Sequence, residues 1–454
     1  MDWILLTIYL VLLFIGWLMV YTVGYRDDPD FSVFNIDYAP GRQLLFVGLS
    51  LLLFFIIAII DWKFWRSFSY FIYLFALVLL GGVLIFGATI KGATAWYTFM
   101  GFSFQPVEIA KFGTALALSN YLSSGSINLN NTKEFSRVLA FLLLPVGLIM
   151  LQPDAGSALI FISFFILFFR EGLSPVVYII GAVLFSVFIG ALLFDITAFL
   201  TALVLTVIFL MILTKRHKTY WLIGFVVLVV SNVLAYIEDL MLYAIILDTL
   251  ALLAISFMIW QRGESRLVMT TLPSLMLCVG LAYAADFTFN KVMLPHQQDR
   301  INVWLHPDKC DPRGSLYNLL QSKMAIGSGG FSGKGFKQGT LTKLNYVPEQ
   351  TTDFIFCTIG EEYGFIGSAA IIILFMGMLF RIVVIAERQR LLFVRHYAYC
   401  VAGIVFFHFF INIGMTMGLV PVIGIPLPFL SYGGSSLLGF TLLLGVLLKL
   451  DTTR

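Results

Sequence analysis

Fourteen apolar runs follow one another along the chain, and most are long enough to cross a membrane as an α-helix. Eleven of them precede a long polar stretch, and three come after it. They lie at about residues 3–23, 42–60, 69–90, 107–122, 137–151, 156–169, 175–194, 196–214, 219–237, 240–260, 267–289, 367–386, 396–418 and 434–448. An even number of crossings places both ends of the chain on the same side of the membrane. The pattern predicts an all-α polytopic membrane protein, a helical bundle with about 14 transmembrane helices and one large loop.

Composition agrees with this prediction and excludes other classes of protein. Of the 454 residues, 60% are hydrophobic and 12% are charged. A soluble globular protein is about 45–50% apolar and about 25% charged, so a soluble enzyme, a disordered chain and a nucleic-acid-binding protein are excluded. Unbroken apolar runs also argue against an outer-membrane barrel, whose strands alternate over about ten residues. The four cysteines form no CxxC pair and predict neither a metal site nor a disulfide framework.

Basic residues predict the orientation. If both termini are cytoplasmic, sixteen lysines and arginines fall in inside segments, and three, Arg26, Arg42 and Lys91, fall in short outside segments. Such an excess is typical of cytoplasmic loops. The inside set is Lys63, Arg66, Lys133, Arg137, Arg170, Lys215, Arg216, Lys218, Arg262, Arg266, Arg381, Arg388, Arg390, Arg395, Lys449 and Arg454. We therefore expect both termini in the cytoplasm and the first apolar run, residues 3–23, to be retained as a membrane helix.

The long polar stretch at residues 290–366 lies outside the cytoplasm in this topology. Its own basic residues do not contradict the orientation, because long loops cross a membrane largely regardless of charge. It is rich in glycine but keeps too many apolar and aromatic residues for a disordered segment. Loops of this length in folded proteins are usually functional, so we expect the chemistry of the protein here rather than a merely solvated connection.

Short polar motifs stand out against the apolar background. The loop carries Asp311-Pro-Arg-Gly314, Ile326-Gly-Ser-Gly-Gly330, Gly333-Lys-Gly335, Thr351-Thr-Asp-Phe354 and Gly360-Glu-Glu362. Elsewhere there are Phe104-Gln-Pro-Val-Glu-Ile-Ala-Lys111, Gln152-Pro-Asp-Ala-Gly156, Asn412-Ile-Gly414, Gly424-Ile-Pro-Leu-Pro428 and Ser431-Tyr-Gly-Gly-Ser-Ser436. Together these motifs resemble the SEDS family (shape, elongation, division, sporulation), the RodA/FtsW peptidoglycan glycosyltransferases, most closely its RodA branch. The resemblance runs from about residue 42 to the end of the chain.

The resemblance implies an enzyme of the bacterial cytoplasmic (inner) membrane. It would polymerise lipid II, the undecaprenyl-diphosphate-linked disaccharide-pentapeptide, into β-1,4 glycan strands during cell elongation. A class B penicillin-binding protein transpeptidase would be its partner. Two alternatives stay open at this point: a lipid II flippase, and a scaffold that only organises the transpeptidase. Transporter sites usually lie near the bilayer midplane, whereas the richest motifs here are in the external loop.

An acidic side chain is the first requirement of the implied chemistry. The lipid diphosphate is already a good leaving group, but the acceptor sugar hydroxyl needs a positioned base. Asp311 occupies the position of the family's essential acidic residue in the Asp-Pro-x-Gly motif. Asp308 lies three residues earlier, and chemistry alone does not separate the two. Without a catalytic role, either aspartate would simply shape a turn beside proline.

The diphosphate requires positive charge or backbone donors. Arg300, Lys334 and Lys337 lie in the loop among glycines whose N–H groups could hold phosphate oxygens. We assign these three residues, together with Gln321, to substrate binding. A divalent cation, magnesium or manganese, could share the phosphate role, although no ligand spacing in the sequence locates one. No organic cofactor is indicated.

Several ionisable residues fall within the apolar runs. Glu108 and Lys111 lie three residues apart on one helix face, a spacing that permits an ion pair. Charged groups inside a membrane are costly and often functional, so the pair is predicted either to line the substrate cavity or to brace the bundle. Each of four other polar residues could contact substrate or could simply cap or brace a helix; these are Asp154, Glu361, Glu362 and Asn412. Asp195 is read as a turn residue, and Asp248 has no obvious partner in the sequence.

The chain also departs from the family pattern. Most members have about ten spans, so we interpret residues 175–266 as an insertion of about four. The predicted organisation is an N-terminal core at 1–174, the insertion at 175–266, a helix at 267–289, the catalytic loop at 290–366 and a C-terminal core at 367–454. Leu316 stands where glycine is usual and is expected to change the loop backbone. Thr351 stands where histidine is usual, so no histidine mechanism is transferred.

Overall fold

The computed structural model describes residues 1–25, 32–90, 92–99, 102–125, 127–213, 218–238, 240–293, 295–312, 314 and 316–453. Five of the basic residues used to predict orientation lie outside these ranges, namely Arg26, Lys91, Lys215, Arg216 and Arg454. Arg313 of the Asp311 motif also lies outside them. The chain divides into two compact units. The larger unit comprises Met1–Ser174 and Cys310–Arg454, and the smaller unit comprises Pro175–Lys309.

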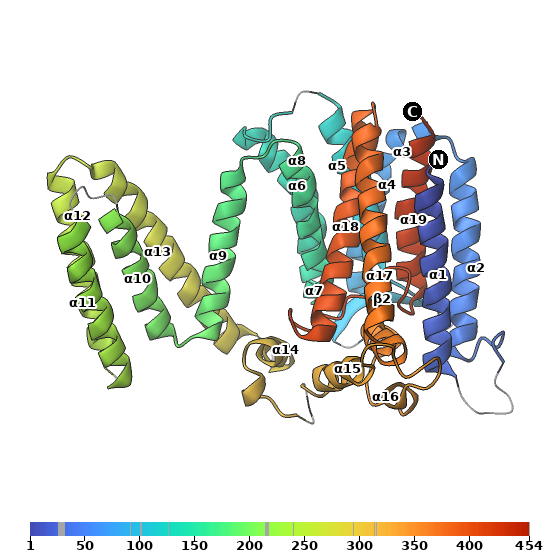
Figure 1. Ribbon diagram of the computed structural model, residues 1–454. Coiled ribbons are helices and arrows are strands. Elements are labelled where there is room, and N and C mark those ends of the chain that lie inside the picture. The colour runs from blue at the N-terminus through green and yellow to red at the C-terminus, as the bar shows by residue number, and fades with distance from the viewer. Residues whose placement is uncertain are drawn as a thin grey trace. The chain divides into compact units, whose positions relative to one another are not determined.

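The larger unit consists of helices and one small sheet (Figure 1). Its first part contains α1 (Trp3–Gly24), α2 (Ala39–Ile59), α3 (Trp62–Ser67), α4 (Ser69–Phe86), β1 (Ala88–Ile90), β2 (Ala93–Phe99), β3 (Phe102–Phe104), α5 (Pro106–Ser123), α6 (Thr132–Met150), α7 (Ala155–Ile160) and α8 (Phe165–Arg170). Its second part contains α15 (Tyr317–Ser328), α16 (Thr340–Lys343), α17 (Ile355–Arg388), α18 (Leu392–Met417) and α19 (Gly434–Leu450).

The helical membrane fold predicted from the apolar runs is confirmed. Each of the runs falls on a helical segment. Within the described ranges, nine helices are long and apolar enough to span a membrane, and shorter apolar helices cover Ala155–Arg170, Trp221–Ile237 and Gly434–Leu450. The remaining two runs form α5 and α6, which carry more polar residues. Such helices are tolerated where neighbouring helices, rather than lipid, surround the polar groups.

A three-stranded antiparallel sheet was not anticipated by the sequence pattern. The apolar run predicted to continue to residue 90 stops being helical at Phe86, and β1, β2 and β3 pair in that order. The hydroxyl of Tyr97 on β2 donates to the carbonyl oxygen of Leu79 on α4 at 3.0 Å. This bond fixes the sheet against the helix that precedes it. Strands of threonine and aromatic residues fit a half-buried sheet, but β1 and β3, with three residues each, are too short to give a clear alternation.

Helices α5 and α18 form the centre of the larger unit. Nearly every side chain of α5 from Pro106 to Ser119 is buried, and so is most of α18. A Cβ atom on Gly113 would lie 3.0 Å from the Cα of Tyr73 on α4. Small residues therefore let α5 approach its neighbour closely, as in other membrane helix pairs. This close packing gives a dry interior in which unpaired charge is expensive.

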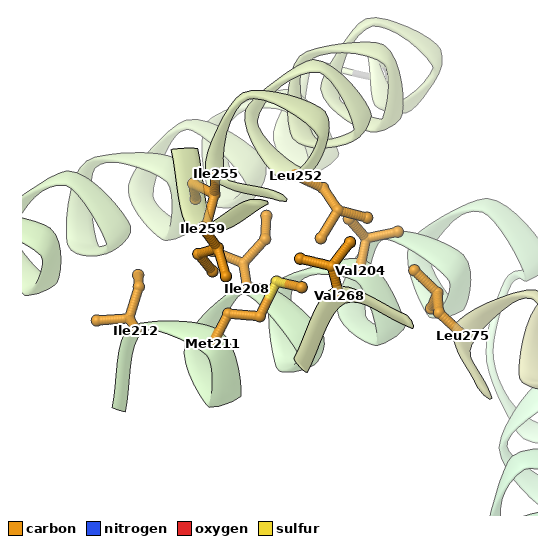
Figure 2. Packing of buried hydrophobic residues seen from close by; sticks show 9 residues of the cluster. All are labelled: Val204, Ile208, Met211, Ile212, Leu252, Ile255, Ile259, Val268 and Leu275. Carbon is orange, nitrogen blue, oxygen red and sulfur yellow. The ribbon is translucent and has the colours of Figure 1, made fainter. Parts of the chain in front are cut away.

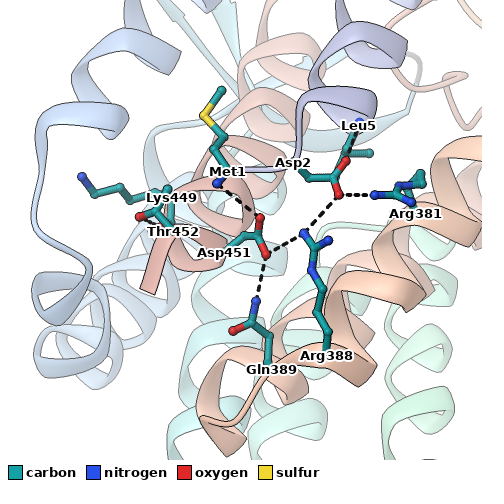
Figure 3. A network of polar contacts seen from close by, with 9 residues as sticks. All are labelled: Met1, Asp2, Leu5, Arg381, Arg388, Gln389, Lys449, Asp451 and Thr452. Atoms are coloured by element: carbon teal, nitrogen blue, oxygen red, sulfur yellow. Dashed lines mark hydrogen bonds and ion pairs between the residues drawn. The ribbon is translucent and has the colours of Figure 1, made fainter. Parts of the chain in front are cut away.

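Both ends of the chain lie at one end of the larger unit, and α15 and α16 lie at the other (Figure 1). At the terminal end, Figure 3 shows a polar cluster in which Arg388 joins two buried carboxylates. One guanidinium nitrogen lies 3.0 Å from Asp2 and 2.8 Å from Asp451. Arg381 also pairs with Asp2, and Gln389 donates to Asp451 at 2.9 Å. The cluster therefore holds α1, α17 and the end of α19 together, as the predicted even number of crossings requires.

The ionised form of Asp2 is favoured in this cluster. Burial acts to raise the pKa of Asp2, but the hydrogen bonds from Arg381 and the Leu5 N–H, together with the charges of Arg381 and Arg388, lower it below its ordinary value. Because the folded-state pKa is depressed, the stabilisation is present above the unfolded-state pKa and is lost as the pH falls through the folded-state value. The cluster is thus intact at neutral pH.

Removing Arg388 should weaken the larger unit. We expect Arg388→Ala to lower the free energy of unfolding by about 2 kcal/mol. Breaking a fully buried ion pair costs about 3–5 kcal/mol, and the loss is smaller here because Arg388 is partly exposed to water. Thermal unfolding of the purified chain in detergent measures this. The matched control is Arg390→Ala, since Arg390 is exposed two residues further along the chain. Equal unfolding temperatures for the two variants would contradict the bridging role of Arg388.

The smaller unit is a separate helical bundle. It contains α9 (Pro175–Leu193), α10 (Ile196–Leu213), α11 (Lys218–Ile237), α12 (Met241–Gln261), α13 (Ser265–Phe287) and α14 (Pro295–Leu305). Figure 2 shows its main apolar cluster, to which α10 contributes Ile208 and Met211, α12 contributes Ile255 and Ile259, and α13 contributes Val268. The unit begins at the first residue of the predicted insertion but continues through α13 and α14 to Lys309.

Two aspartates of the smaller unit have defined partners. Asp195 precedes α10 and accepts hydrogen bonds from the N–H groups of Thr197 and Ala198 at 3.0 and 3.1 Å, in agreement with its interpretation as a turn residue. The hydrogen bond from the Thr197 hydroxyl and then these N–H bonds lower the pKa of Asp195. Asp248, which had no evident partner in the sequence, is buried and accepts from the amide of Asn232 at 3.1 Å. The sequence missed this pair because the two residues lie on different helices.

Candidate active site

Motifs from distant parts of the chain meet at the end of the larger unit opposite the chain termini. The side chain of Gln105, just before α5, donates to Asp154 at 3.2 Å. The Gln105 N–H donates to Ser435 at the start of α19, and the Ser435 hydroxyl donates to the carbonyl oxygen of Ser103. Asp154 also accepts from the Ser157 N–H at 3.1 Å and caps α7. These bonds join three of the sequence motifs and support the capping interpretation of Asp154.

Asp311 lies in an exposed turn directly before α15. Its carbonyl oxygen accepts from the Gly314 N–H at 3.1 Å, and the Gly314 carbonyl accepts from the Tyr317 N–H at 3.1 Å. Asp308 is also exposed, in the short 3-10 helix Pro307–Lys309. Exposure therefore does not separate the two aspartates, and the choice of Asp311 still depends on the motif.

Leu316 does not distort this turn. The residue has φ −78° and ψ −17°, values that any L-residue adopts without strain. Its side chain is buried and anchors the start of α15. Leucine therefore occupies this position without conformational strain, and the expected difference from the backbone of relatives that carry glycine here stays a prediction.

Glu361 organises the part of the loop that follows. Its carboxylate is buried and accepts from the N–H groups of Leu341 and Thr342, both at 2.9 Å, and from the Thr342 hydroxyl at 2.6 Å. The ammonium of Lys334 lies 2.6 Å from the same carboxylate. One buried side chain on α17 therefore holds Lys334 and the whole of α16 in place. Glu361 braces the loop, one of the two roles that the sequence left open.

The two loop lysines assigned to the diphosphate have different surroundings. Lys334 is partly exposed and shares its charge with Glu361 and with the Thr340 hydroxyl, which lies at 2.9 Å. Lys337 donates to the hydroxyl of Tyr21 at 2.8 Å, and its ammonium lies 3.5 Å from the ring centroid of Tyr25. A cation over an aromatic face is stabilised by the ring quadrupole. Both ammonium groups are thus held in fixed positions.

The other two predicted binding residues are less constrained. Gln321 is half-buried on α15, in the larger unit. Arg300 is exposed on α14, in the smaller unit. A group of three or more His, Cys, Asp or Glu side chains arranged to hold a metal ion is not found among the described residues. These side chains therefore do not define a cation site of their own.

A stripe of polar residues on α18 connects the site to the helix core. His408, Asn412 and Thr416 are spaced by four residues and therefore share one helix face. The Asn412 amide donates to the carbonyl oxygens of Asp353 and Ile425 at 2.8 and 2.7 Å. The Thr416 carbonyl accepts from a serine of α15 at 3.0 Å. Asn412 thus braces the two loop motifs that contain Asp353 and Ile425. Bracing is one of the two roles that the sequence left open for this residue.

The predicted Glu108–Lys111 ion pair exists and includes a third member. Lys111 lies 2.9 Å from Glu108, and its ammonium also donates to Nε2 of His408 at 3.0 Å. Nδ1 of His408 faces the carbonyl oxygen of Pro426 at 3.1 Å. Since Lys111 is only a donor and the carbonyl is only an acceptor, His408 is neutral and carries its proton on Nδ1. Lys111 is fully buried, so the geometry favours a brace over a substrate contact.

Removing Lys111 should therefore destabilise the fold rather than only weaken substrate binding. We expect Lys111→Met to lower the free energy of unfolding by about 3–5 kcal/mol, because Glu108 would be left as an uncompensated buried charge. The double variant Glu108→Gln/Lys111→Met removes both charges and should recover most of the loss. Thermal unfolding in detergent provides the measurement. A stable Lys111→Met protein with a raised KM would instead support the substrate-cavity role.

A cavity of about 680 Å³ opens where α1 ends and α2 begins. The loop residues from Lys337 to Thr351 form its other wall. It is lined by Thr22, Val23, Gly24, Tyr25, Asp37, Tyr38, Ala39, Lys337, Lys343, Asn345, Val347, Pro348, Glu349, Gln350 and Thr351. The Thr351 carbonyl accepts from the Tyr432 N–H at 2.8 Å, which ties the cavity wall to the motif before α19. We refer to this cavity as the loop pocket.

Sequence reasoning missed several residues of this site. His408 and Tyr21 carry no motif signal, because each acts on a partner distant in the chain. Gln350 acts on nearby residues, but nothing in the local sequence indicates that its side chain is buried. A histidine within an apolar run was the one available indication for His408. Nothing in the local sequence around Tyr21 distinguishes it from an ordinary aromatic residue at a membrane interface.

Comparison with known proteins agrees with this geometry. The sequence model of the family described as "Cell cycle protein", which groups FtsW, RodA and SpoVE, matches residues 2–209 and 196–454. The chain is 28% identical over 458 residues to the peptidoglycan glycosyltransferase RodA of Treponema pallidum, covering 100% of this chain and 98% of that protein. It is 27% identical over 414 residues to the peptidoglycan glycosyltransferase MrdB of Escherichia coli K12, covering 91% and 85%.

Solved structures share the fold. A chain of a peptidoglycan synthase complex, described as coordinating polymerization and crosslinking, aligns with a TM-score of 0.63 at 24% identity over 99% of this chain and 97% of that chain. RodA of Thermus thermophilus aligns with a TM-score of 0.57 at 22% identity over 100% of this chain and 97% of that chain. Because the matched segments of the family model together span nearly the whole sequence, the protein belongs to the FtsW, RodA and SpoVE family of cell cycle proteins.

Proposed function

We propose that this protein is a peptidoglycan glycosyltransferase that polymerises lipid II into β-1,4 glycan strands during cell elongation. The observation that carries the proposal is the convergence of the family motifs, with the exposed turn of Asp311, at one end of a membrane-embedded bundle. The curated relatives named above are glycosyltransferases. The active end faces outward from the cytoplasmic (inner) membrane, and both termini lie in the cytoplasm, on the strength of the positive-inside bias.

The proposed reaction needs one base and a neutralised diphosphate. The carboxylate of Asp311 takes the proton from the acceptor sugar hydroxyl as that oxygen forms a bond to C1 of the donor sugar. The bond between C1 and the diphosphate oxygen breaks, and undecaprenyl diphosphate leaves. Lys334 and Lys337 of the larger unit neutralise the negative charge of the leaving group, and Gln321 contacts the substrate. Arg300 remains, from the sequence, a further candidate for binding the diphosphate. A divalent cation carried with the diphosphate would assist this neutralisation.

The transpeptidase that crosslinks the strands is the proposed partner. A class B penicillin-binding protein has the required activity, since the products of one enzyme are the substrates of the other. The fold neighbour described as coordinating polymerization and crosslinking supports such a pairing. Copurification of the two full-length proteins from membranes tests it.

The flippase alternative is not favoured. Its best argument was a charged pair inside the membrane, but Glu108 and Lys111 are buried against His408 and do not line the loop pocket. The scaffold alternative predicts a protein without chemistry of its own. It would tolerate changes at Asp311 and fail when helices that contact a partner are altered.

A single pair of assays separates these functions. The purified full-length protein is incubated with lipid II, and polymer is resolved by gel electrophoresis after the stem peptides are labelled. The same protein in liposomes is tested for translocation of fluorescent lipid II. Polymer formation without the partner supports the proposal. Translocation without polymer would support the flippase, and neither activity would support the scaffold.

A further inference from the structure

The loop pocket contains a buried acceptor without a donor. The Gln350 side chain is 4% exposed, and its amide nitrogen donates to the Thr342 carbonyl at 2.9 Å and to Asn345 Oδ1 at 2.7 Å. Its oxygen, Oε1, has no hydrogen-bond partner among the described residues. Buried polar atoms are nearly always paired, so this oxygen is suited to accept from a molecule in the pocket.

The backbone around the pocket is also unusual. Five non-glycine residues in the described chain have positive φ, and three of them line this pocket: Lys337, Asn345 and Glu349, with φ of 58°, 53° and 60°. Non-glycine residues adopt this conformation at a cost and only where the surrounding structure enforces it. Such residues gather at ligand sites. Here they shape one continuous wall of the cavity.

The charge of the pocket indicates what kind of ligand it accepts. The two lysines of the lining, Lys337 and Lys343, are matched by two carboxylates, Asp37 and Glu349. The ammonium of Lys337 is further occupied by the hydroxyl of Tyr21 at 2.8 Å. A balanced, polar lining favours a neutral ligand rich in hydrogen-bonding groups over a diphosphate, which requires a net excess of donors and positive charge.

We propose that the loop pocket is a saccharide subsite that holds N-acetylated sugar rings of the glycan substrate. A sugar hydroxyl or acetamido N–H donates to Gln350 Oε1, and Tyr38 supplies an aromatic ring to the lining of the same pocket. The cavity has the size of an ordinary small-molecule pocket. The diphosphate is bonded directly to the first sugar, so Lys337 in the pocket lining can still bind a phosphate oxygen while the sugar occupies the pocket. This inference rests on the proposed function, because it assigns the glycan substrate of that function to the loop pocket.

A soluble glycan tests the pocket separately from catalysis. The probe is a β-1,4-linked N-acetylglucosamine tetramer, which lacks lipid, diphosphate and peptide. Its binding to the full-length protein in detergent is measured by saturation-transfer NMR and by titration. We expect the wild type and Asp311→Ala to bind the tetramer equally, and inorganic pyrophosphate not to displace it. Displacement by pyrophosphate would overturn the assignment to sugar.

Two matched pairs of variants locate the contact. Gln350→Met and Gln350→Glu both lose the bonds to Thr342 and Asn345, but only the glutamate keeps an acceptor oxygen. We expect tetramer binding to weaken about tenfold more in Gln350→Met than in Gln350→Glu. Lys343→Trp fills the pocket and should abolish binding, whereas Leu344→Trp, at an exposed neighbour outside the lining, should not. The Lys343 pair keeps the test decisive if the Gln350 variants unfold.

The results also separate this inference from the proposed function. A wild-type protein that polymerises lipid II but does not bind the tetramer would overturn the saccharide subsite and leave the glycosyltransferase intact. Unchanged tetramer binding in Lys343→Trp would overturn the location. Binding that follows the expected pattern in a protein without polymerase activity would support the subsite while contradicting the proposed function.

Discussion

Replacing Asp311 with alanine is expected to reduce the polymerisation of lipid II by about 100-fold or more, with the fold intact. A positioned general base contributes about 10²–10⁴-fold to a rate, and the acceptor hydroxyl has no other route to lose its proton in the proposed reaction. Asp311 is exposed and its turn is held by backbone bonds, so alanine leaves the loop in place. Initial rates of polymer formation, with the thermal unfolding temperature measured in parallel, check both parts.

Asp308→Ala is the matched control for this experiment. Both aspartates are exposed and lie three residues apart, so the substitution makes the same change in charge in the same part of the chain. We expect Asp308→Ala to retain activity within a few-fold of the wild type. If Asp308→Ala abolished polymerisation and Asp311→Ala did not, the base would be Asp308. Full activity in both variants would remove an aspartate base from the mechanism.

Replacing Glu361 with glutamine is expected to have the second large effect, this time on the loop itself. The substitution exchanges one acceptor oxygen for an NH₂ group that faces the donors of Leu341, Thr342 and Lys334. Loss of a buried charged partner costs about 3–5 kcal/mol, so α16 and the wall of the loop pocket should lose their fixed structure. Hydrogen exchange at the amides of residues 341 and 342 should accelerate, and polymerase activity should fall.

The neighbouring glutamate provides the comparison. Glu362 is as buried as Glu361 on the same helix, but its Oε2 has no hydrogen-bond partner among the described residues. Glu362→Gln therefore removes no acceptor that is in use, because the amide oxygen keeps the bond from the Lys337 N–H and the NH₂ group replaces the unpartnered Oε2. In the Glu362→Gln variant, we expect hydrogen exchange at the amides of residues 341 and 342 to be as slow as in the wild type. Equal acceleration in the two variants would show that charge in this helix, rather than the hydrogen bonds of Glu361, holds the loop.

Local sequence predicted the helices well, because the signal for a membrane helix is contained within the helix. About twenty apolar residues are needed to span the hydrocarbon core, and no distant partner is required to recognise them. The sheet at residues 88–104 escaped prediction for the opposite reason, since its strands are defined by pairing and by the bond from Tyr97 to α4.

The candidate site was predictable only in part. Motif residues such as Asp311 and Glu361 could be selected from the sequence because a family resemblance marks them. The spacing of Glu108 and Lys111 also predicted their ion pair, which the structure confirms. The sequence left two roles open for several of these residues. His408 shows that Lys111 is a brace, because the His408 ring completes the buried set of partners around the Lys111 ammonium. The two residues are 297 positions apart in the sequence, so no local pattern predicts this contact.

The sequence by itself determined the membrane fold, and it predicts the side of each loop and the motifs assigned to the chemistry, since all of these depend on composition and on neighbours along the chain. Tertiary structure decided which polar groups are braces and which are available to a ligand. That distinction depends on whether a donor from another element reaches a buried acceptor. Glu361 meets such donors from α16, whereas Gln350 Oε1 in the loop pocket meets none among the described residues.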